Sequence, residues 1–164
     1  MAVHSIKMVQ CIPAPLEKVW DFFSVAGNLL QLTPPEMKMA VLSKDPMEAI
    51  FEGQLIEYKL RPLFRIPAYW KTLISKVEPG KMFIDEQEKG PYSLWKHEHH
   101  FKSIEGGVEM TDLVHYKNPM GMLGLFVNSL IVRKRLREIF TYRYHKIEEI
   151  FGKWEGQALQ IEIS

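Results

Sequence analysis

Two histidines stand two positions apart in a stretch whose pattern predicts a β-strand from Ser93 to Ser103. Successive side chains of a strand point to opposite faces, so His97 and His99 share one face with Trp95 and Phe101. The opposite face is polar and typical of solvent exposure, and it holds Leu94, Lys96, Glu98, His100 and Lys102. We therefore expect both histidines to point inward. Interior imidazoles can transfer protons near neutral pH, hold a metal ion or orient a ligand.

Two carboxylates fall on the inner faces of other predicted strands. Asp112 alternates with apolar residues between Val108 and Lys117, and Asp85 shares a face with Phe83 and Gln87. A histidine beside an aspartate suits acid–base catalysis. Two histidines and one carboxylate, from either Asp85 or Asp112, also match a known type of metal site. The sequence does not align three ligands, so we expect no metal or other cofactor and assign no catalytic residue.

A cation lies in the apolar stripe of a predicted helix that runs from about Phe126 to Phe151. Arg143 stands three residues after Phe140 and four before Ile147, which places it on the buried side. A buried guanidinium needs a partner. Asp85 or Asp112 would supply one from the protein, which we favour, and an acidic ligand would be the alternative.

The inner surface thus carries more polar groups than a plain core of this size needs. A mostly apolar pocket with a few converging polar groups is the usual form of a small-molecule site. For any single residue, the alternative that it only satisfies a protein partner stays open. The predicted ligand-binding residues are Tyr58, Trp70, Asp85, Gln87, Trp95, His97, His99, Asp112, Tyr116 and Arg143.

These residues need a curved sheet and a helix to position them. Strands joined by short turns pair antiparallel, and helices on one face of such a sheet give an α+β fold. We predict an internal cavity between the sheet and the long C-terminal helix. Residues 1–151 would form a single domain, and the tail 152–164 would be an edge strand or disordered. The predicted strands are Val3–Cys11, Met37–Leu42, Gly53–Leu60, Ala68–Val77, Met82–Gln87, Ser93–Ser103 and Val108–Lys117, with a first helix from Pro15 to Phe23.

Length and composition exclude several classes of protein. A chain of 164 residues fits one domain, and its single cysteine cannot form an internal disulfide. Lys and Arg total 21 against 20 Asp and Glu, which argues against a nucleic-acid-binding protein. No apolar run reaches ~18 residues, and the first residues lack the apolar core of a signal peptide. We expect a cytoplasmic protein without stable membrane insertion.

Several motifs between residues 3 and 151 resemble those of a known superfamily. They are Pro13-Ala14-Pro15, Val19-Trp20-Asp21-Phe22, Asn28-Leu29 with Thr33-Pro34-Pro35, Phe83-Ile84-Asp85-Glu86-Gln87, Gly90-Pro91-Tyr92, Trp95-Lys96-His97-Glu98-His99, Met110-Thr111-Asp112 and Phe140-Thr141-Tyr142-Arg143. The sequence resembles the START-like, or SRPBCC, helix-grip proteins, and within them a bacterial ligand-binding subgroup. The resemblance implies a curved sheet that grips the C-terminal helix and a cavity for lipids, polyketides or other hydrophobic molecules. It implies no single chemistry, since some members catalyse aromatisation or dehydration and many only bind.

The leading hypothesis is a binding protein for a small hydrophobic ligand that is lipid-, polyketide- or aromatic-like and has a polar or acidic end. The alternative is a cyclase or dehydratase that uses His97 or His99 with Asp112 as acid–base groups. Two apolar segments, Met120–Phe126 and Leu63-Phe64, could form the mouth of the cavity, a homodimer contact or packing under a loop.

Overall fold

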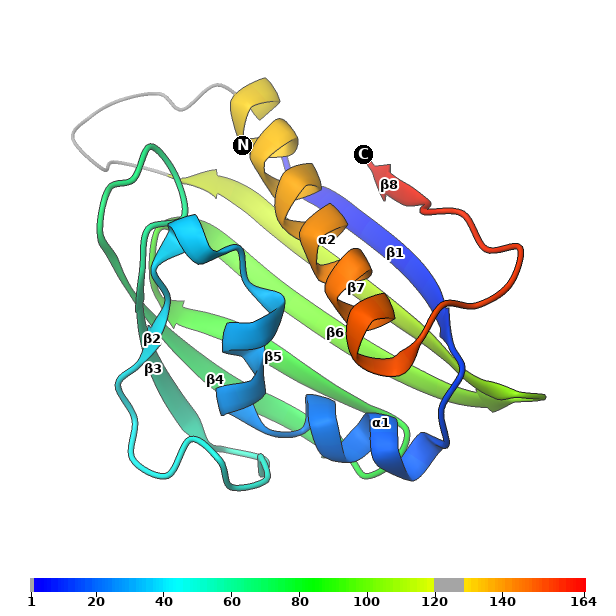
Figure 1. The fold of residues 1–164 in the computed structure, drawn as a ribbon. Helices are drawn as coiled ribbons and strands as arrows, with labels where there is room; N and C mark the ends of the chain where they lie inside the picture. The colour runs from blue at the N-terminus through cyan, green and yellow to red at the C-terminus, as the bar shows by residue number, and fades with distance from the viewer. Residues whose placement is uncertain (1, 120–128) are drawn as a thin grey trace.

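Eight antiparallel strands form one strongly curved sheet in a computed structural model that describes residues 2–119 and 129–164 (Figure 1). The strand order is β2-β3-β4-β5-β6-β7-β1-β8, so the first strand joins the sheet beside β7. The strands are β1 (His4–Ile12), β2 (Ala40–Val41), β3 (Leu55–Leu60), β4 (Ala68–Glu78), β5 (Met82–Lys89), β6 (Tyr92–Ile104), β7 (Gly107–Pro119) and β8 (Ile161–Ile163).

The helices lie on the concave face of this sheet (Figure 1). They are α1 (Leu16–Phe23), α2 (Ser129–Phe151) and two short 3-10 helices, η1 (Ala26–Leu32) and η2 (Pro35–Met37). The long helix α2 crosses the sheet, as predicted, and the α+β helix-grip fold class is confirmed. Residues 126–128, where the sequence predicted the helix to begin, lie outside the described residues.

The phase of α2 follows its apolar stripe. Its buried residues are Val132, Leu136, Phe140, Arg143, Tyr144 and Ile147. Burying a side chain such as Leu136 or Phe140 stabilises the fold by about 1.5–3 kcal/mol each. That gain fixes the rotation of the helix and carries the charged Arg143 side chain to the sheet-facing side.

The hairpin of β6 and β7 sets the positions of the central polar residues. Its register places Trp95 opposite Tyr116, His97 opposite Val114 and His99 opposite Asp112. The hairpin turn ends at Gly107, where an added Cβ would lie 2.0 Å from the carbonyl oxygen of Ile12. Only glycine therefore lets β7 begin so close to the end of β1.

The C-terminal tail returns to the sheet. Ile161 and Ile163 of β8 pair with Met8 and Ile6 of β1, respectively, which makes β8 an edge strand. Within the tail 152–164, the strand is confined to Ile161–Ile163. Among the helices of the described ranges, none is long and apolar enough to cross a membrane.

Candidate ligand-binding cavity

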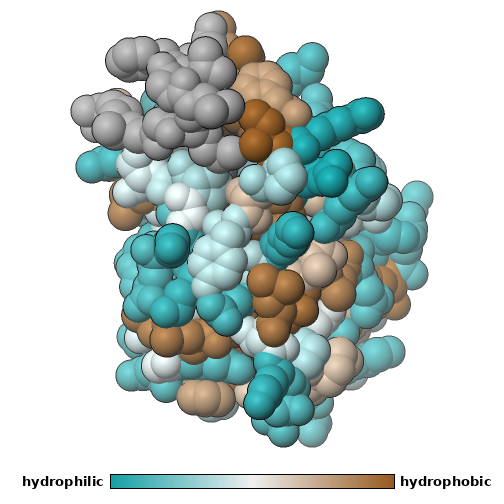
Figure 2. Space-filling view, turned by 90° about the vertical axis from the view of Figure 1, so that its left-hand side faces the viewer, coloured by the Kyte–Doolittle hydropathy of each residue, from teal (hydrophilic) through white to brown (hydrophobic). Residues whose placement is uncertain are grey.

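A cavity of about 180 Å³ lies between the concave face of the sheet, α2 and the η1 segment. Most of its wall is apolar. Strands β3 and β4 contribute Ile56, Tyr58, Trp70, Thr72 and Ile74, and α2 contributes Leu136, Ile139 and Phe140. On the outer face seen in Figure 2, hydrophobic residues are scattered between hydrophilic ones outside the grey region. The apolar side chains of β3, β4 and α2 gather around this open space.

Seven of the ten predicted site residues lie on the cavity wall. They are Tyr58, Trp70, Asp85, Trp95, His97, His99 and Arg143. The two histidines point inward on β6, and the exposed side chains of Leu94 and Lys102 lie on the opposite face. The period-2 alternation therefore assigned the faces of this strand correctly.

Gln87, Tyr116 and Asp112 do not line the cavity. Gln87 follows the last β5–β6 pair and closes the turn instead: its Nε2 donates to the carbonyl of Tyr92 at 2.6 Å, and its Oε1 accepts from the Tyr92 N–H at 3.2 Å. Tyr116 is fully buried in the core beneath α2, 6.3 Å from the ring of Trp95. The sequence correctly predicted that these two side chains lie on the inner face of the sheet, but neither of them reaches the cavity.

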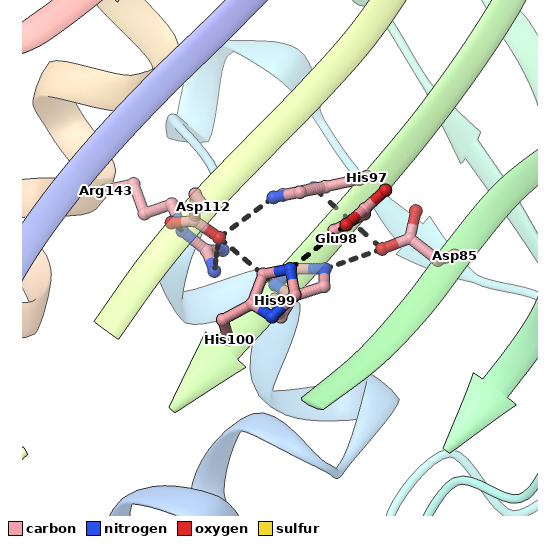
Figure 3. Close-up of polar contacts among 7 residues, drawn as sticks. All are labelled: Asp85, His97, Glu98, His99, His100, Asp112 and Arg143. Atoms are coloured by element: carbon pink, nitrogen blue, oxygen red, sulfur yellow. Dashed lines mark hydrogen bonds and ion pairs between the residues drawn. The ribbon is translucent and has the colours of Figure 1, made fainter. Parts of the chain in front are cut away.

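Asp112 lies behind the histidines as the centre of a buried polar cluster, which we define as Asp85, His97, His99, Asp112 and Arg143 (Figure 3). Arg143 donates from Nε to Oδ2 of Asp112 at 3.0 Å and from Nη2 to Oδ1 at 3.2 Å. His97 Nε2 lies 2.8 Å from the same Oδ1. The predicted protein partner of Arg143 is thus Asp112, and an acidic ligand is not needed to compensate the guanidinium.

Asp85 closes the other side of the polar cluster, next to the cavity. Its Oδ2 lies 2.7 Å from Nε2 of His99 and 3.8 Å from Nδ1 of His97. The two imidazoles stack with their centroids 3.7 Å apart and their planes at 30°. His99 Nδ1 approaches Asp112 Oδ1 to 3.1 Å, although not at an angle that makes a hydrogen bond. Both rings are therefore held between two carboxylates.

Burial and charge act in opposite directions on the pKa values of this cluster. Burial alone raises the pKa of Asp112, but the Arg143 guanidinium and the hydrogen bond from His97 hold that pKa well below its usual value. Burial and the neighbouring His99 lower the pKa of His97. Burial also lowers the pKa of His99, but Asp85 and Asp112 outweigh it and raise that pKa. A proton in the polar cluster therefore resides preferentially on His99.

The cavity-facing acceptor of the cluster is Asp85. Its side chain is 19% exposed, whereas that of Asp112 is 1% exposed. Within residues 2–119 and 129–164, no side chain or backbone N–H donates a hydrogen bond to Oδ1 of Asp85. Asp85 therefore offers the cavity a carboxylate oxygen that has free acceptor capacity.

Several wall residues were not among the predicted site residues. Ile56, Thr72 and Ile74 share their strand faces with Tyr58 and Trp70, so the same alternation could have identified them. Leu29 and Leu32 of η1 also line the cavity. Nothing in their spacing distinguishes a cavity wall from a plain core.

The mouth proposed for Met120–Phe126 lies outside the described residues. In the other apolar segment, Phe64 is exposed, and Leu63 packs partly buried against the core beneath α2. A homodimer contact at these segments stays a prediction.

No protein-family model matches the sequence, and no curated protein matches it. Solved structures do match the fold. An aromatase/cyclase, Zhui, from Streptomyces sp. R1128 superposes with a TM-score of 0.66 at 13% identity, over 91% of this chain and 93% of that chain. A START superfamily protein from Mycobacterium smegmatis gives a TM-score of 0.64 at 12% identity, over 90% and 97%.

A third similar structure is a nucleoside-diphosphate sugar epimerase from Corynebacterium glutamicum. It gives a TM-score of 0.61 at 21% identity and covers 87% of this chain but only 28% of that chain. At these identities the likeness concerns the fold, not the chemistry. Together with the sheet order and the position of α2, it shows that the chain has the START-like (SRPBCC) helix-grip fold.

Proposed function

We propose that this protein binds a compact hydrophobic molecule with one polar end in the cavity beneath α2. The observation that carries the proposal is the contrast within the wall. Isoleucine, leucine and aromatic side chains cover most of it, and its ionisable groups gather at one polar corner formed by Asp85, His97, His99 and Arg143. A site of this kind provides affinity through apolar contact and orientation through the polar corner.

The size of the cavity favours an aromatic or polyketide-like ligand over a long acyl chain. Its volume is about 180 Å³. An apolar cavity of about 150 Å³ in a protein core takes up benzene. One ring, two fused rings or a short acyl chain therefore match the space between α2 and the sheet, whereas a long-chain fatty acid would need the wall to open.

The polar end of the ligand should donate a hydrogen bond. Arg143 is already engaged by Asp112, so the cavity presents the free Oδ1 of Asp85 rather than an unpaired cation. A hydroxyl, phenol or enol O–H can donate to that oxygen. A carboxylate ligand would bring a second negative charge beside it.

Replacing Trp70 by alanine is expected to weaken the binding of 2-naphthol about tenfold. Trp70 forms one wall of the cavity, edge-on to Trp95 at 5.3 Å and Tyr92 at 5.6 Å. Large aromatic side chains dominate the contact area of such sites. Calorimetric titration with a chelator in the buffer measures the affinity and keeps metal ions out of the comparison.

The matched control is Trp154→Ala. Trp154 lies beside Gly106 and is not among the cavity-lining residues, so its removal should leave 2-naphthol affinity unchanged. Equal affinities for wild type and Trp70→Ala would remove Trp70 from the site. Absence of saturable binding by the wild type, for 2-naphthol and comparable bicyclic compounds, would contradict the proposed function itself.

Enolisation chemistry is a second candidate function. It is supported by the 2.7 Å contact between His99 and Asp85 on the wall, because a paired histidine and carboxylate can move a proton at a bound ligand. Exchange of the C1 protons of 2-tetralone in D₂O distinguishes the two functions. If the wild-type protein accelerates the exchange over the rate in buffer and Asp85→Asn does not, the protein catalyses enolisation. If the exchange proceeds at the buffer rate, ligand binding is the only function supported.

A further inference from the structure

We propose that Asp85, His97 and His99 form a binding site for a divalent transition-metal ion at the polar corner of the cavity. The three residues come from the neighbouring strands β5 and β6 (Figure 3). One ring nitrogen of each histidine and one carboxylate oxygen of Asp85 all lie within 4.8 Å of one another. The proposal does not depend on the apolar ligand, since the protein alone supplies the three donors.

The spacing of the donor atoms fits a single ion. Zinc bonds to nitrogen and oxygen are about 2.0–2.2 Å long, so two ligands of a tetrahedral ion lie about 3.4 Å apart. Oδ2 of Asp85 is 2.7 Å from His99 Nε2 and 3.8 Å from His97 Nδ1, on either side of that value. Each of these two separations differs by less than about 1 Å from the distance that an ion requires.

The second carboxylate supports the histidines from behind. His97 presents Nδ1 to Asp85 and its other nitrogen, Nε2, to Asp112 at 2.8 Å. His99 presents Nε2 to Asp85, and its Nδ1 lies 3.1 Å from the same Asp112 oxygen. Metal-bound histidines usually direct their second nitrogen to a carboxylate, as His97 does here, which fixes the tautomer and the orientation of the ring. His99 Nδ1 lies close to Asp112 but makes no hydrogen bond to it. Arg143 in turn holds Asp112 in place.

The charges of the polar cluster also favour a cation. Asp85 and Asp112 carry two negative charges, and Arg143 compensates only one. A cation at this corner, either a proton on a ring nitrogen or a bound metal ion that replaces it, offsets the charge of the second carboxylate.

One rearrangement is needed. The imidazoles stack with an angle of 30° between their planes, so both nitrogens can point at one ion only if the rings open by rotation about χ2. This torsion is broad in histidine, and the open cavity beside the rings leaves room for the movement. The remaining coordination position would face the cavity, as in sites that bind a water or a ligand oxygen.

The donor set selects the class of metal. Two imidazoles and one carboxylate suit zinc or ferrous iron, whereas magnesium and calcium prefer oxygen ligands alone. We use zinc and cobalt(II) as probes, because cobalt(II) replaces zinc and its visible absorption reports the ligands and geometry. Metal-free, untagged protein is titrated with each ion in the absence of any organic ligand.

We expect one zinc ion per chain and a cobalt(II) spectrum of four- or five-coordinate geometry with nitrogen ligands. His97→Gln, His99→Gln and Asp85→Asn should each weaken zinc binding at least about 100-fold, and Asp112→Asn about 10–100-fold, because it acts only through the rings. The matched control is His100→Gln. His100 is the next residue on β6, faces the opposite side with a 43% exposed side chain, pairs with Glu98 at 3.0 Å and should be dispensable.

Circular dichroism establishes that each variant is folded. If a histidine variant does not fold, the more exposed Asp85→Asn and the wild-type cobalt(II) spectrum still decide the question. The proposal is overturned if the wild type takes up no zinc at submillimolar concentration. It is also overturned if the cobalt(II) spectrum shows oxygen ligands alone, or if His100→Gln abolishes binding while Asp85→Asn retains it. Failure of metal binding would leave 2-naphthol binding, measured with a chelator present, unaffected.

Discussion

Replacing Arg143 by leucine is expected to lower the free energy of unfolding by about 3–5 kcal/mol, the usual effect of removing one partner of a buried ion pair. The guanidinium makes two hydrogen bonds to Asp112, whose side chain is 1% exposed. Leucine leaves that carboxylate buried without its main counter-charge. Urea unfolding at neutral pH, with a chelator present, measures the difference.

The matched control is Arg137→Leu on the same helix. Arg137 is exposed and contacts only the backbone carbonyl of Ile161, at 3.3 Å, among the hydrogen bonds of the described residues. Its replacement should change stability by less than about 1 kcal/mol. The double variant Arg143→Leu/Asp112→Leu should recover part of the loss, because it removes both charges together. An Arg143→Leu variant as stable as wild type would show that the pair does not form.

The effect of Arg143→Leu should also depend on pH. The charged and titratable groups around Asp112 are Arg143 on α2, His97 and His99 on β6, and Asp85 on β5. Together they lower the pKa of Asp112 in the folded protein. Its ionised form therefore stabilises the wild type fully above the ordinary aspartate pKa of about 3.9, and this contribution is lost as the pH falls from that value through the lower pKa of Asp112 in the folded protein. Without Arg143 the pKa of Asp112 rises. The difference in the free energy of unfolding between wild type and Arg143→Leu should be full at neutral pH and should become smaller below about pH 4.

The cavity should bind 2-naphthol roughly 100-fold more tightly than 2-naphthoate at neutral pH. The two compounds share their rings and differ in the polar end. The hydroxyl can donate to the free Oδ1 of Asp85, whereas the carboxylate would face that negatively charged side chain, because His99 and Arg143 are already paired with Asp85 and Asp112. Like charges in a partly buried site disfavour each other by several kcal/mol, and a 100-fold ratio corresponds to about 2.7 kcal/mol.

Asp85→Asn tests the origin of this preference. The amide keeps the shape of the side chain and removes its charge, so the ratio of the two affinities should fall toward unity, mainly through tighter binding of 2-naphthoate. Glu86→Gln, a change of the same kind at the neighbouring position, should leave the ratio unchanged, since Glu86 does not line the cavity. If the wild type, measured with a chelator in the buffer, bound 2-naphthoate more tightly than 2-naphthol, a cation and not Asp85 would contact the polar end of the ligand.

Much of this site could be predicted because the positions of its side chains follow from the repeat of a strand or a helix. Two-residue alternation placed His97, His99 and Trp95 on the inner face of β6, and the spacing of Phe140, Arg143 and Ile147 gave the phase of α2. Both depend on local geometry, which a sequence encodes directly. The motifs that resemble those of the helix-grip proteins indicated the fold, because they span the same order of strands and helices.

The sequence could not predict which of the inward-pointing residues reach the cavity and which lie behind its wall. Asp85 and Asp112 both point inward, yet only the packing of α2 decides that Asp112 receives Arg143 and that Asp85 reaches the cavity. Register shifts between β4 and β5, at Lys71/Thr72 and Ile74/Lys76, also change which side chains oppose each other. Such irregularities depend on the assembled sheet and leave no clear pattern in the chain.

The position of 2-naphthol in the complex tests the proposed function most directly. Ile56 and Ile74 are buried on the cavity wall, whereas Ile163 lies on the edge strand β8, away from it. In NMR spectra of methyl-labelled protein, we expect intermolecular nuclear Overhauser effects from the ring protons of 2-naphthol to the methyl groups of Ile56 and Ile74 and none to Ile163. Effects confined to Ile163 and other surface methyl groups, with the cavity methyl groups unchanged at saturation, would contradict a binding function for the cavity.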